Sequence, residues 1–116
     1  MTATPHPFEI RESRTDGWLR LSLTGELDRA SAPMLENRLA SLRVVKSPVR
    51  LDLSHLEFID SAGIHLLFQT IGEAKLKRWS VEIEPELAPQ VSRLFRLVHL
   101  DRFVLNQRQA PARGRA

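Results

Sequence analysis

The chain has 116 residues, 42% of them hydrophobic and 27% charged, a composition typical of one globular domain with its own core. It has no cysteine, which excludes disulfides and thiol catalysis, and no stretch near the roughly 18 apolar residues of a membrane span. The N-terminus lacks the basic and apolar regions of a secretory signal. We therefore expect a cytoplasmic protein with no membrane partner.

The net charge of +3 comes from the C-terminal segment 106–116, whose charged residues are Arg108, Arg113 and Arg115. Without them the rest of the chain has 14 basic and 14 acidic residues. A balanced domain with a short basic tail is weak evidence for DNA or RNA binding, so no direct nucleic-acid partner is expected.

The first two predicted elements form a hairpin. Residues 8–14 (FEIRESR) begin with alternating polarity, and residues 15–17 (TDG) are a turn signal. Residues 18–27 (WLRLSLTGEL) then alternate leucine with polar residues, which is the period of a half-buried strand.

An amphipathic helix follows. Ser31 is a candidate N-cap and Pro33 suits a first helical turn. Leucines then recur at helical spacing, at Leu35, Leu39 and Leu42.

The second half of the chain alternates strands with helices. A strand begins at residue 49 and its apolar residues run to Ile59, and a helix is expected over about 62–77. That helix has an apolar stripe of Ile64, Leu67, Phe68 and Ile71. A strand over 79–85 is expected to end at Pro85.

The last predicted elements are a helix within 85–100 and a short strand at 102–106. Strand–helix–strand units indicate parallel pairing with right-handed crossovers. The sequence therefore predicts an α/β domain with a mixed sheet of four or five strands flanked by helices. We expect the domain to occupy residues 8–105, between disordered segments at 1–7 and 106–116.

Motifs for catalysis and for metal binding are missing. The sequence has no glycine-rich phosphate loop, no G-x-S-x-G elbow and no H-x-x-x-H pair among its four histidines. A triad of Ser61, His55 and an aspartate can be imagined, but no spacing supports it. We therefore expect no catalytic residue, no metal and no cofactor.

The stretch 58–63 (FIDSAG) joins the predicted third strand to the second helix. Either Asp60 or Ser61 can cap the helix, and one cap is enough, so one of the two is left available. Gly63 allows close approach of a backbone or a partner, at a cost of about 1 kcal/mol relative to alanine. Local chemistry leaves two readings of Ser61 open, a helix cap or a functional hydroxyl.

Three segments carry a resemblance to a known family. They are LTGELDRASAPML, VRLDLSHLEFIDSAGIHLL and APQVSRLFRLVHLDRFV, and together they cover roughly residues 8 to 105. The chain resembles STAS domains, specifically bacterial anti-sigma factor antagonists, and the D-S-x-G motif in the middle segment is the most specific match.

The resemblance implies a phosphorylation switch. In that family a partner anti-sigma factor kinase phosphorylates the serine of D-S-x-G, which is Ser61 here. The unphosphorylated antagonist binds the anti-sigma factor and frees the sigma factor, and a phosphatase reverses the modification. The implied partner-binding residues are Glu26, Asp28, Asp60, Ser61, Ala62, Gly63 and His65.

Two positions depart from the family pattern. Ala62 stands where many relatives carry a second hydroxyl residue, so Ser61 alone is left to be modified. His65 stands where relatives often have a small residue, one helical turn beyond Ser61. It adds bulk and a titratable ring to the expected interface.

Other readings remain open from the sequence. The chain is alternatively a STAS scaffold subunit of a stress-signalling assembly or of a lipid-transport ATPase complex. Two further alternatives are an enzyme with Ser61 as its nucleophile and a nucleic-acid binder led by the basic tail. A monomer is expected, since no strongly apolar outer helix face stands out.

Overall fold

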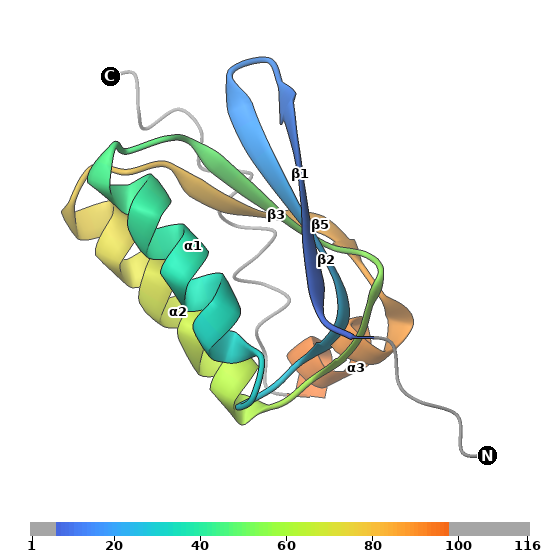
Figure 1. Cartoon of the computed structure of the whole chain (residues 1–116). Helices are drawn as coiled ribbons and strands as arrows, with labels where there is room; N and C mark the ends of the chain where they lie inside the picture. The colour runs from blue at the N-terminus through green and yellow to red at the C-terminus, as the bar shows by residue number, and fades with distance from the viewer. Residues whose placement is uncertain (1–6, 98–116) are drawn as a thin grey trace.

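A computed structural model describes residues 7–97, and Figure 1 shows it. The predicted disordered segments (apart from residue 7), the strand at 102–106 and the end of the last helix lie outside the described residues. The elements in chain order are β1 (Glu9–Thr15), β2 (Trp18–Leu27), α1 (Ala32–Val44), β3 (Val49–Leu53), β4 (Leu56–Ile59), α2 (Ser61–Leu76), β5 (Val81–Leu87) and α3 (Pro89–Leu97).

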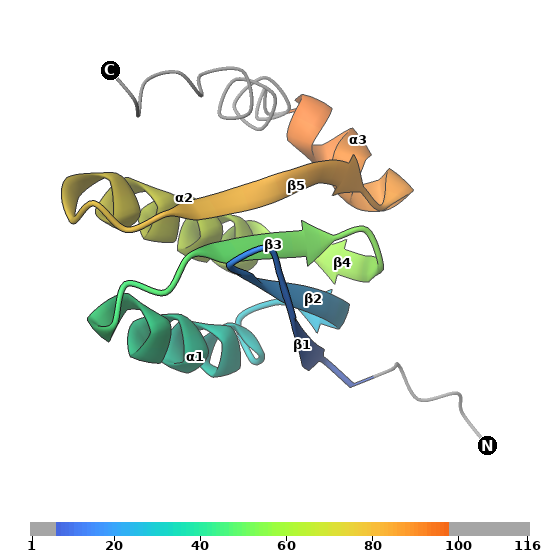
Figure 2. The same cartoon turned by 90° about the horizontal axis from the view of Figure 1, so that it is seen from above.

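The strands form one mixed sheet in the order β1-β2-β3-β5, with β4 paired to β2 (Figure 2). The hairpin β1–β2 is antiparallel, with Thr15 opposite Trp18 at its turn. All the other pairs are parallel. The predicted α/β class and mixed sheet are confirmed.

The segment 49–59 forms two strands, whereas the sequence analysis counted one. The side chain of Asp52 accepts hydrogen bonds from the backbone N–H of Ser54 (2.9 Å) and from its hydroxyl (2.6 Å), and this turn interrupts the strand. β3 pairs with the first half of β2, and β4 pairs with its second half after a register shift at Gly25.

The prediction that Pro85 ends its strand is wrong, because β5 continues to Leu87. β5 lies at one end of the strand order and pairs with β3 alone. Its register against β3 shifts between Ile83 and Leu87, and Pro85 lies within that irregularity. Proline is tolerated on an edge strand at a bulge, because no ladder N–H is required there.

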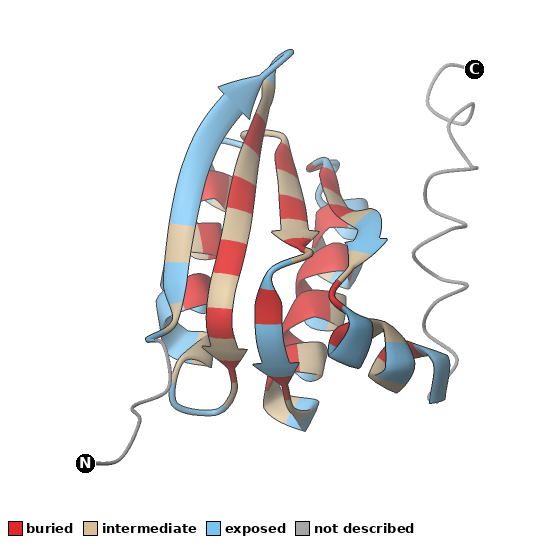
Figure 3. Cartoon of the chain, turned by 90° about the vertical axis from the view of Figure 1, so that its right-hand side faces the viewer, coloured by how far each residue is buried: buried red, intermediate tan, exposed pale blue. Residues whose placement is uncertain are grey.

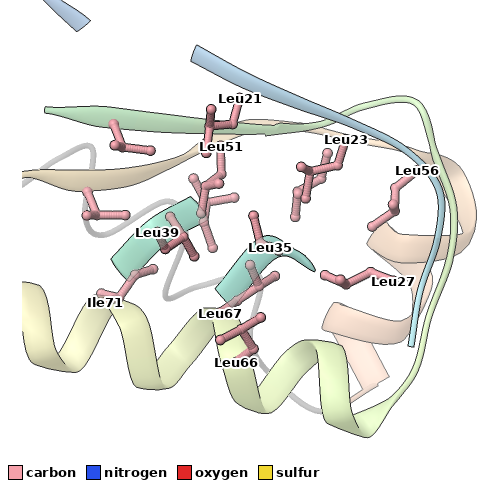
Figure 4. Packing of buried hydrophobic residues seen from close by; sticks show 14 of the residues in the cluster. Leu21, Leu23, Leu27, Leu35, Leu39, Leu51, Leu56, Leu66, Leu67 and Ile71 are labelled. Atoms are coloured by element: carbon pink, nitrogen blue, oxygen red, sulfur yellow. The ribbon is translucent and has the colours of Figure 1, made fainter. Parts of the chain in front are cut away.

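The helices α1 and α2 lie side by side on one face of the sheet (Figure 1). The strands β2 and β3 alternate buried and half-buried residues, which Figure 3 shows as red and tan bands. The buried residues of a strand share one face, and here they belong to the same core cluster as the buried leucines of α1 and α2. Figure 4 shows leucines of both layers meeting in the core, among them Leu21, Leu35, Leu51 and Leu67, each fully buried. α3 packs against β4 and adds the fully buried side chains of Val91 and Phe95 to this core.

Within residues 7–97, no helix has the length and apolar character that crossing a membrane requires.

Candidate protein-interaction site

The strand ends of β2 and β4 place two acidic residues at one edge of the sheet. Leu27 and Ile59 are register partners in this parallel pair, so Asp28 and Asp60 directly follow neighbouring strands. The backbone N–H of Asp60 donates to the carbonyl oxygen of Leu27 at 3.2 Å. The loop after β2 and the start of α2 therefore form one surface.

Asp60 is the residue that caps α2. Its backbone is extended, and its Oδ1 accepts a hydrogen bond from the N–H of Gly63 at 3.0 Å. Its Oδ2 accepts from the backbone N–H of Arg29, in the β2–α1 loop, at 3.3 Å. Both carboxylate oxygens of Asp60 are thus used within the domain.

Ser61 is exposed at the first position of α2. Because Asp60 satisfies the helix end, Ser61 is not needed as a cap, and its hydroxyl has no hydrogen-bond partner among residues 7–97. Of the two roles that the sequence left open, the structure assigns the cap to Asp60 and leaves the hydroxyl of Ser61 accessible to another molecule.

Ser31 behaves differently from the predicted side-chain cap of α1. It occupies the N-cap position, but its hydroxyl does not bond to the first turn of the helix. It donates instead to the carbonyl oxygen of Glu26 (2.6 Å) and accepts from the backbone N–H of Asp28 (2.9 Å). Its hydroxyl closes the β2–α1 loop, a role that depends on the loop conformation and has no local sequence signal.

Asp28 organises the same loop. Its Oδ1 accepts from the backbone N–H groups of Ala30 and Ser31, each at 3.0 Å, which is a local aspartate turn. Asp28 and Glu26 are both half-buried. Asp28 therefore holds in place the loop that is bonded to Asp60, while Glu26 belongs to the half-buried residues of β2, on the sheet face opposite the buried ones.

Gly63 is buried, and the close approach that it permits is made by the chain itself. A Cβ atom at this position would lie 2.7 Å from the carbonyl oxygen of Leu27 and 2.8 Å from Cγ1 of Ile59. Such distances are far inside van der Waals contact, so only glycine lets α2 lie this close to the end of β2. Gly63 thus sets how closely the first turn of α2 lies to the end of β2.

The remaining predicted residues lie on the outer side of α2. Ala62 is half-buried, and His65 is exposed one turn beyond Ser61. The structure thus brings Asp28, Asp60, Ser61, Ala62, Gly63 and His65 to one end of the helical layer, and places Glu26 near the end of β2 among its half-buried residues.

An apolar groove beside this surface was missed by the sequence analysis. Phe58, counted there as part of an apolar strand, is 48% exposed. It lines a groove of about 280 Å³ between β4 and α3, with Ile59, Gln90, Arg93, Leu94 and Leu97. The amide of Gln90 donates to the carbonyl oxygen of Glu57 at 2.8 Å and holds α3 beside the strand. The sequence gives no signal for this groove, because it needs α3 in its place.

The imagined triad of Ser61 and His55 is not formed. His55 lies in the turn before β4, and the four residues of β4 separate it from Asp60 and Ser61. An extended strand of this length spans about 15 Å, well beyond hydrogen-bond reach. The Nδ1 atom of His55 lies 3.1 Å from the hydroxyl of Ser54 instead.

Comparison with known proteins agrees with this architecture. The family model described as "Mlab, STAS domain" matches residues 10–106. The chain belongs to the STAS domain family. Since the match covers most of the chain, it includes the described strands and helices from Ile10 onward, and Ser61 within them.

Two proteins similar to this STAS domain are named as anti-sigma factor antagonists. The anti-sigma-B factor antagonist of Bacillus subtilis (strain 168) is 26% identical over 92 residues, which cover 79% of this chain and 82% of that protein. The crystal structure of an anti-sigma factor antagonist from Mycobacterium paratuberculosis is 26% identical and has a TM-score of 0.71, covering 88% of this chain and 86% of that one.

A third similarity concerns the fold. The structure of the Bacillus cell fate determinant SpoIIAA in its phosphorylated form has a TM-score of 0.62 at 18% identity, covering 81% of this chain and 85% of that one. The predicted resemblance to the STAS-domain antagonists is confirmed by these comparisons.

Proposed function

We propose that this STAS domain is an anti-sigma factor antagonist whose binding is switched by phosphorylation of Ser61. As a cytoplasmic monomer it binds an anti-sigma factor serine kinase when Ser61 is unmodified and releases it when Ser61 is phosphorylated. A phosphatase acting on phosphorylated Ser61 restores binding. The main support for this proposal is that Asp60 caps α2, so the hydroxyl of Ser61 is exposed and has no partner in the described part of the chain.

The position of Ser61 suits a switch that leaves the fold intact. A phosphate group adds about −1.5 to −2 charges at neutral pH. At the first position of a helix these charges meet the positive end of the helix dipole, so the domain tolerates them. The hydroxyl is exposed, so modification displaces no buried group.

The same charges are unfavourable inside an interface. Phosphorylated Ser61 would lie next to Asp60, with Asp28 close by across the sheet edge. A partner that covers this surface would have to remove water from the phosphate while bringing like charges together. Phosphorylation therefore weakens binding through desolvation and repulsion.

The proposed partner surface combines two loops and one helix face. Its exposed or half-buried members are Glu26, Asp28, Asp60, Ser61, Ala62 and His65, while buried Gly63 sets their spacing. The names of the relatives support an anti-sigma factor as the partner. The phosphorylated structure of SpoIIAA supports a phosphorylated state for the fold.

The proposal describes a binding protein and not an enzyme. Two of the similar proteins are antagonists by name, and His55 lies too far along β4 to activate Ser61. A fluorophosphonate probe, which labels activated serines, should therefore leave Ser61 unlabelled.

The test is to mix the purified protein with candidate anti-sigma factor kinases, with and without ATP. Binding is followed by titration calorimetry, and the modified residue is located by mass spectrometry. We expect phosphate on Ser61, retained binding by Ser61→Ala without modification, and loss of binding by Ser61→Asp. Phosphate on another serine, or equal binding by both variants, contradicts the switch.

One alternative keeps the fold and drops the switch. The matching family model is described as "Mlab, STAS domain" and does not carry the name of an antagonist, so a scaffold subunit of a lipid-transport ATPase or of a stress-signalling assembly is the alternative. A constitutive scaffold needs no phosphate. Stable co-purification with such a complex, unchanged by Ser61→Asp, would favour this alternative.

A further inference from the structure

A second distinctive surface lies at the other end of the helical layer. It consists of residues 43–48 after α1 and residues 75–80 after α2, and we call it the helix-end tip. The indole Nε1 of Trp79 donates to the carbonyl oxygen of Ser47 at 2.6 Å, and the N–H of Val49 donates to the carbonyl oxygen of Ser80 at 2.9 Å. Buried Trp79 thus ties the two segments into one unit.

Large aliphatic side chains project from this tip. Val44 is 81% exposed, Val45 71% and Leu76 85%, and Leu76 and Val44 are the most exposed large hydrophobic residues of the described chain. Isolated exposed aliphatics are common, but three of them on two joined segments form a cluster. The cluster adds nothing to the core.

The same two segments are strongly basic. Their sequences, RVVKSP and KLKRWS, contain Arg43, Lys46, Lys75, Lys77 and Arg78 and no acidic residue. Arg43 is paired with Glu73 at 2.7 Å, while Lys46, Lys77 and Arg78 are exposed. The negative ends of the helix dipoles favour basic residues here, but they do not account for the exposed aliphatics.

The backbone conformation also indicates that the basic residues of the tip are not explained by stability alone. Lys46 (φ 52°) and Arg78 (φ 57°) follow the two helices in the left-handed conformation that favours glycine. A long basic residue at each of these positions is less stable than glycine would be. The nearby hairpin turn adds Arg14 and Asp16, whose charges cancel, so the tip stays positive.

We infer that the helix-end tip makes a peripheral contact with an anionic lipid bilayer. Val44, Val45 and Leu76 would enter the boundary between headgroups and acyl chains, while Lys46, Lys77 and Arg78 meet the anionic headgroups. An acidic protein would complement the charges alone, whereas an anionic bilayer complements both the basic residues and the exposed aliphatic ones of the same two segments. This inference departs from the expectation of no membrane partner, which rested on the lack of a spanning segment; a peripheral contact needs no such segment.

This contact is compatible with partner binding at Ser61. α2 has 16 residues and begins at Ser61, so its length of about 24 Å separates that surface from the tip. A domain held to a bilayer by the tip would present Ser61 on the side away from the lipid. The inferred membrane contact therefore does not depend on the proposed phosphorylation switch.

The test is co-sedimentation of the full chain with vesicles of phosphatidylcholine, with and without phosphatidylglycerol. We expect binding only to vesicles with the anionic lipid, and weaker binding as salt is raised. The double variant Lys46→Ser, Lys77→Ser should lower the partition coefficient about fivefold for each charge. The double variant Val45→Ser, Leu76→Ser should lower it severalfold at unchanged charge.

The matched control is the double variant Arg93→Ser, Arg96→Ser, which removes two exposed charges from α3. It should change binding less than twofold. An equal loss in this control would assign the binding to net charge and overturn the inference. So would the absence of vesicle binding, or tip-dependent binding to polyglutamate alone, which would assign the tip to an acidic protein.

Discussion

The carboxylate of Asp60 accepts a hydrogen bond from the backbone N–H of Gly63 at 3.0 Å, across the first turn of α2. This bond makes Asp60 the N-cap of α2. It satisfies the helix end with the residue before Ser61, and it involves a glycine that lies against the end of β2. The capping group, the exposed serine and the close packing beneath them are therefore consequences of one local arrangement.

Gly63→Ala should destabilise the domain, although alanine has the higher helix propensity. The new Cβ would lie 2.7 Å from the carbonyl oxygen of Leu27, so α2 would have to move away from β2. We expect a loss of about 1–3 kcal/mol in the free energy of unfolding. Urea denaturation followed by the fluorescence of buried Trp79 measures it.

Gly72→Ala is the matched control for that variant. Gly72 lies in the same helix, is exposed and has no neighbour within 4 Å of an added Cβ. The substitution should stabilise the domain by up to about 1 kcal/mol through helix propensity alone. Equal effects of the two substitutions would contradict the packing described for Gly63.

Asp60→Ala and Ser61→Ala should differ in stability. Asp60→Ala removes the acceptor for Gly63 and for Arg29, and should cost about 1–2 kcal/mol. Ser61→Ala removes a hydroxyl without a partner in the described chain, and should change the free energy of unfolding by less than about 0.5 kcal/mol. Thermal and urea unfolding of both variants measure this, and a larger cost for Ser61→Ala would make Ser61 the cap.

The sequence predicts the regular parts of this fold well. The alternation of leucines in β2 and the helical spacing of Leu35, Leu39 and Leu42 each indicate one structure, and the bounds of β2 are as predicted. Both patterns follow from burial of one face, which is encoded locally. That α1 and α2 share one sheet face was not predicted, because it follows from right-handed crossovers only once the strand order β2-β3-β5 is known.

The sequence predictions that were wrong or incomplete concern features that depend on contacts between distant parts of the chain. The turn between β3 and β4 requires the side chain of Asp52, and the continuation of β5 through Pro85 requires an edge position in the sheet. At the site, Asp60 and Ser61 are both good caps, and the sequence cannot choose between them. Bonds from Arg29 and Gly63 to Asp60 make the choice, and one of these partners is 31 positions away.

Asp52 should make the stability depend on pH in the acid range. Burial raises the pKa of its carboxyl, but hydrogen bonds from the hydroxyl and N–H of Ser54 and from the hydroxyl of Ser22 outweigh burial and lower it below 3.8. A lowered folded pKa means that the stabilisation is complete above the unfolded value near 3.8. It is lost as the pH falls through the folded pKa.

The variant Asp52→Asn tests this. It should be less stable than wild type by about 1 kcal/mol at neutral pH, because a neutral amide accepts weaker bonds from Ser22 and Ser54. The difference should stay constant down to about pH 4 and shrink below it. Urea unfolding at a series of pH values measures the gap, and a gap that widens in acid would contradict the direction of the shift.

Phe58 should contribute to partner binding more than to stability. Phe58 is 48% exposed and lines the groove between β4 and α3. We propose that the partner also covers this neighbouring groove; because aromatic residues are frequent interface hot spots, Phe58→Ser should weaken binding of the partner kinase by about tenfold or more. The free energy of unfolding should change much less than for a buried phenylalanine, which costs about 3–5 kcal/mol.

Leu76→Ser is the control, because it removes an even more exposed side chain at the far end of α2. It should leave kinase binding unchanged while weakening attachment to anionic vesicles, and Phe58→Ser should do the reverse. Calorimetric titration with the kinase and vesicle sedimentation of both variants give the four values needed. Loss of kinase binding in both variants would mean that the partner covers the whole length of α2, and the two ends of the helix would then belong to one interface.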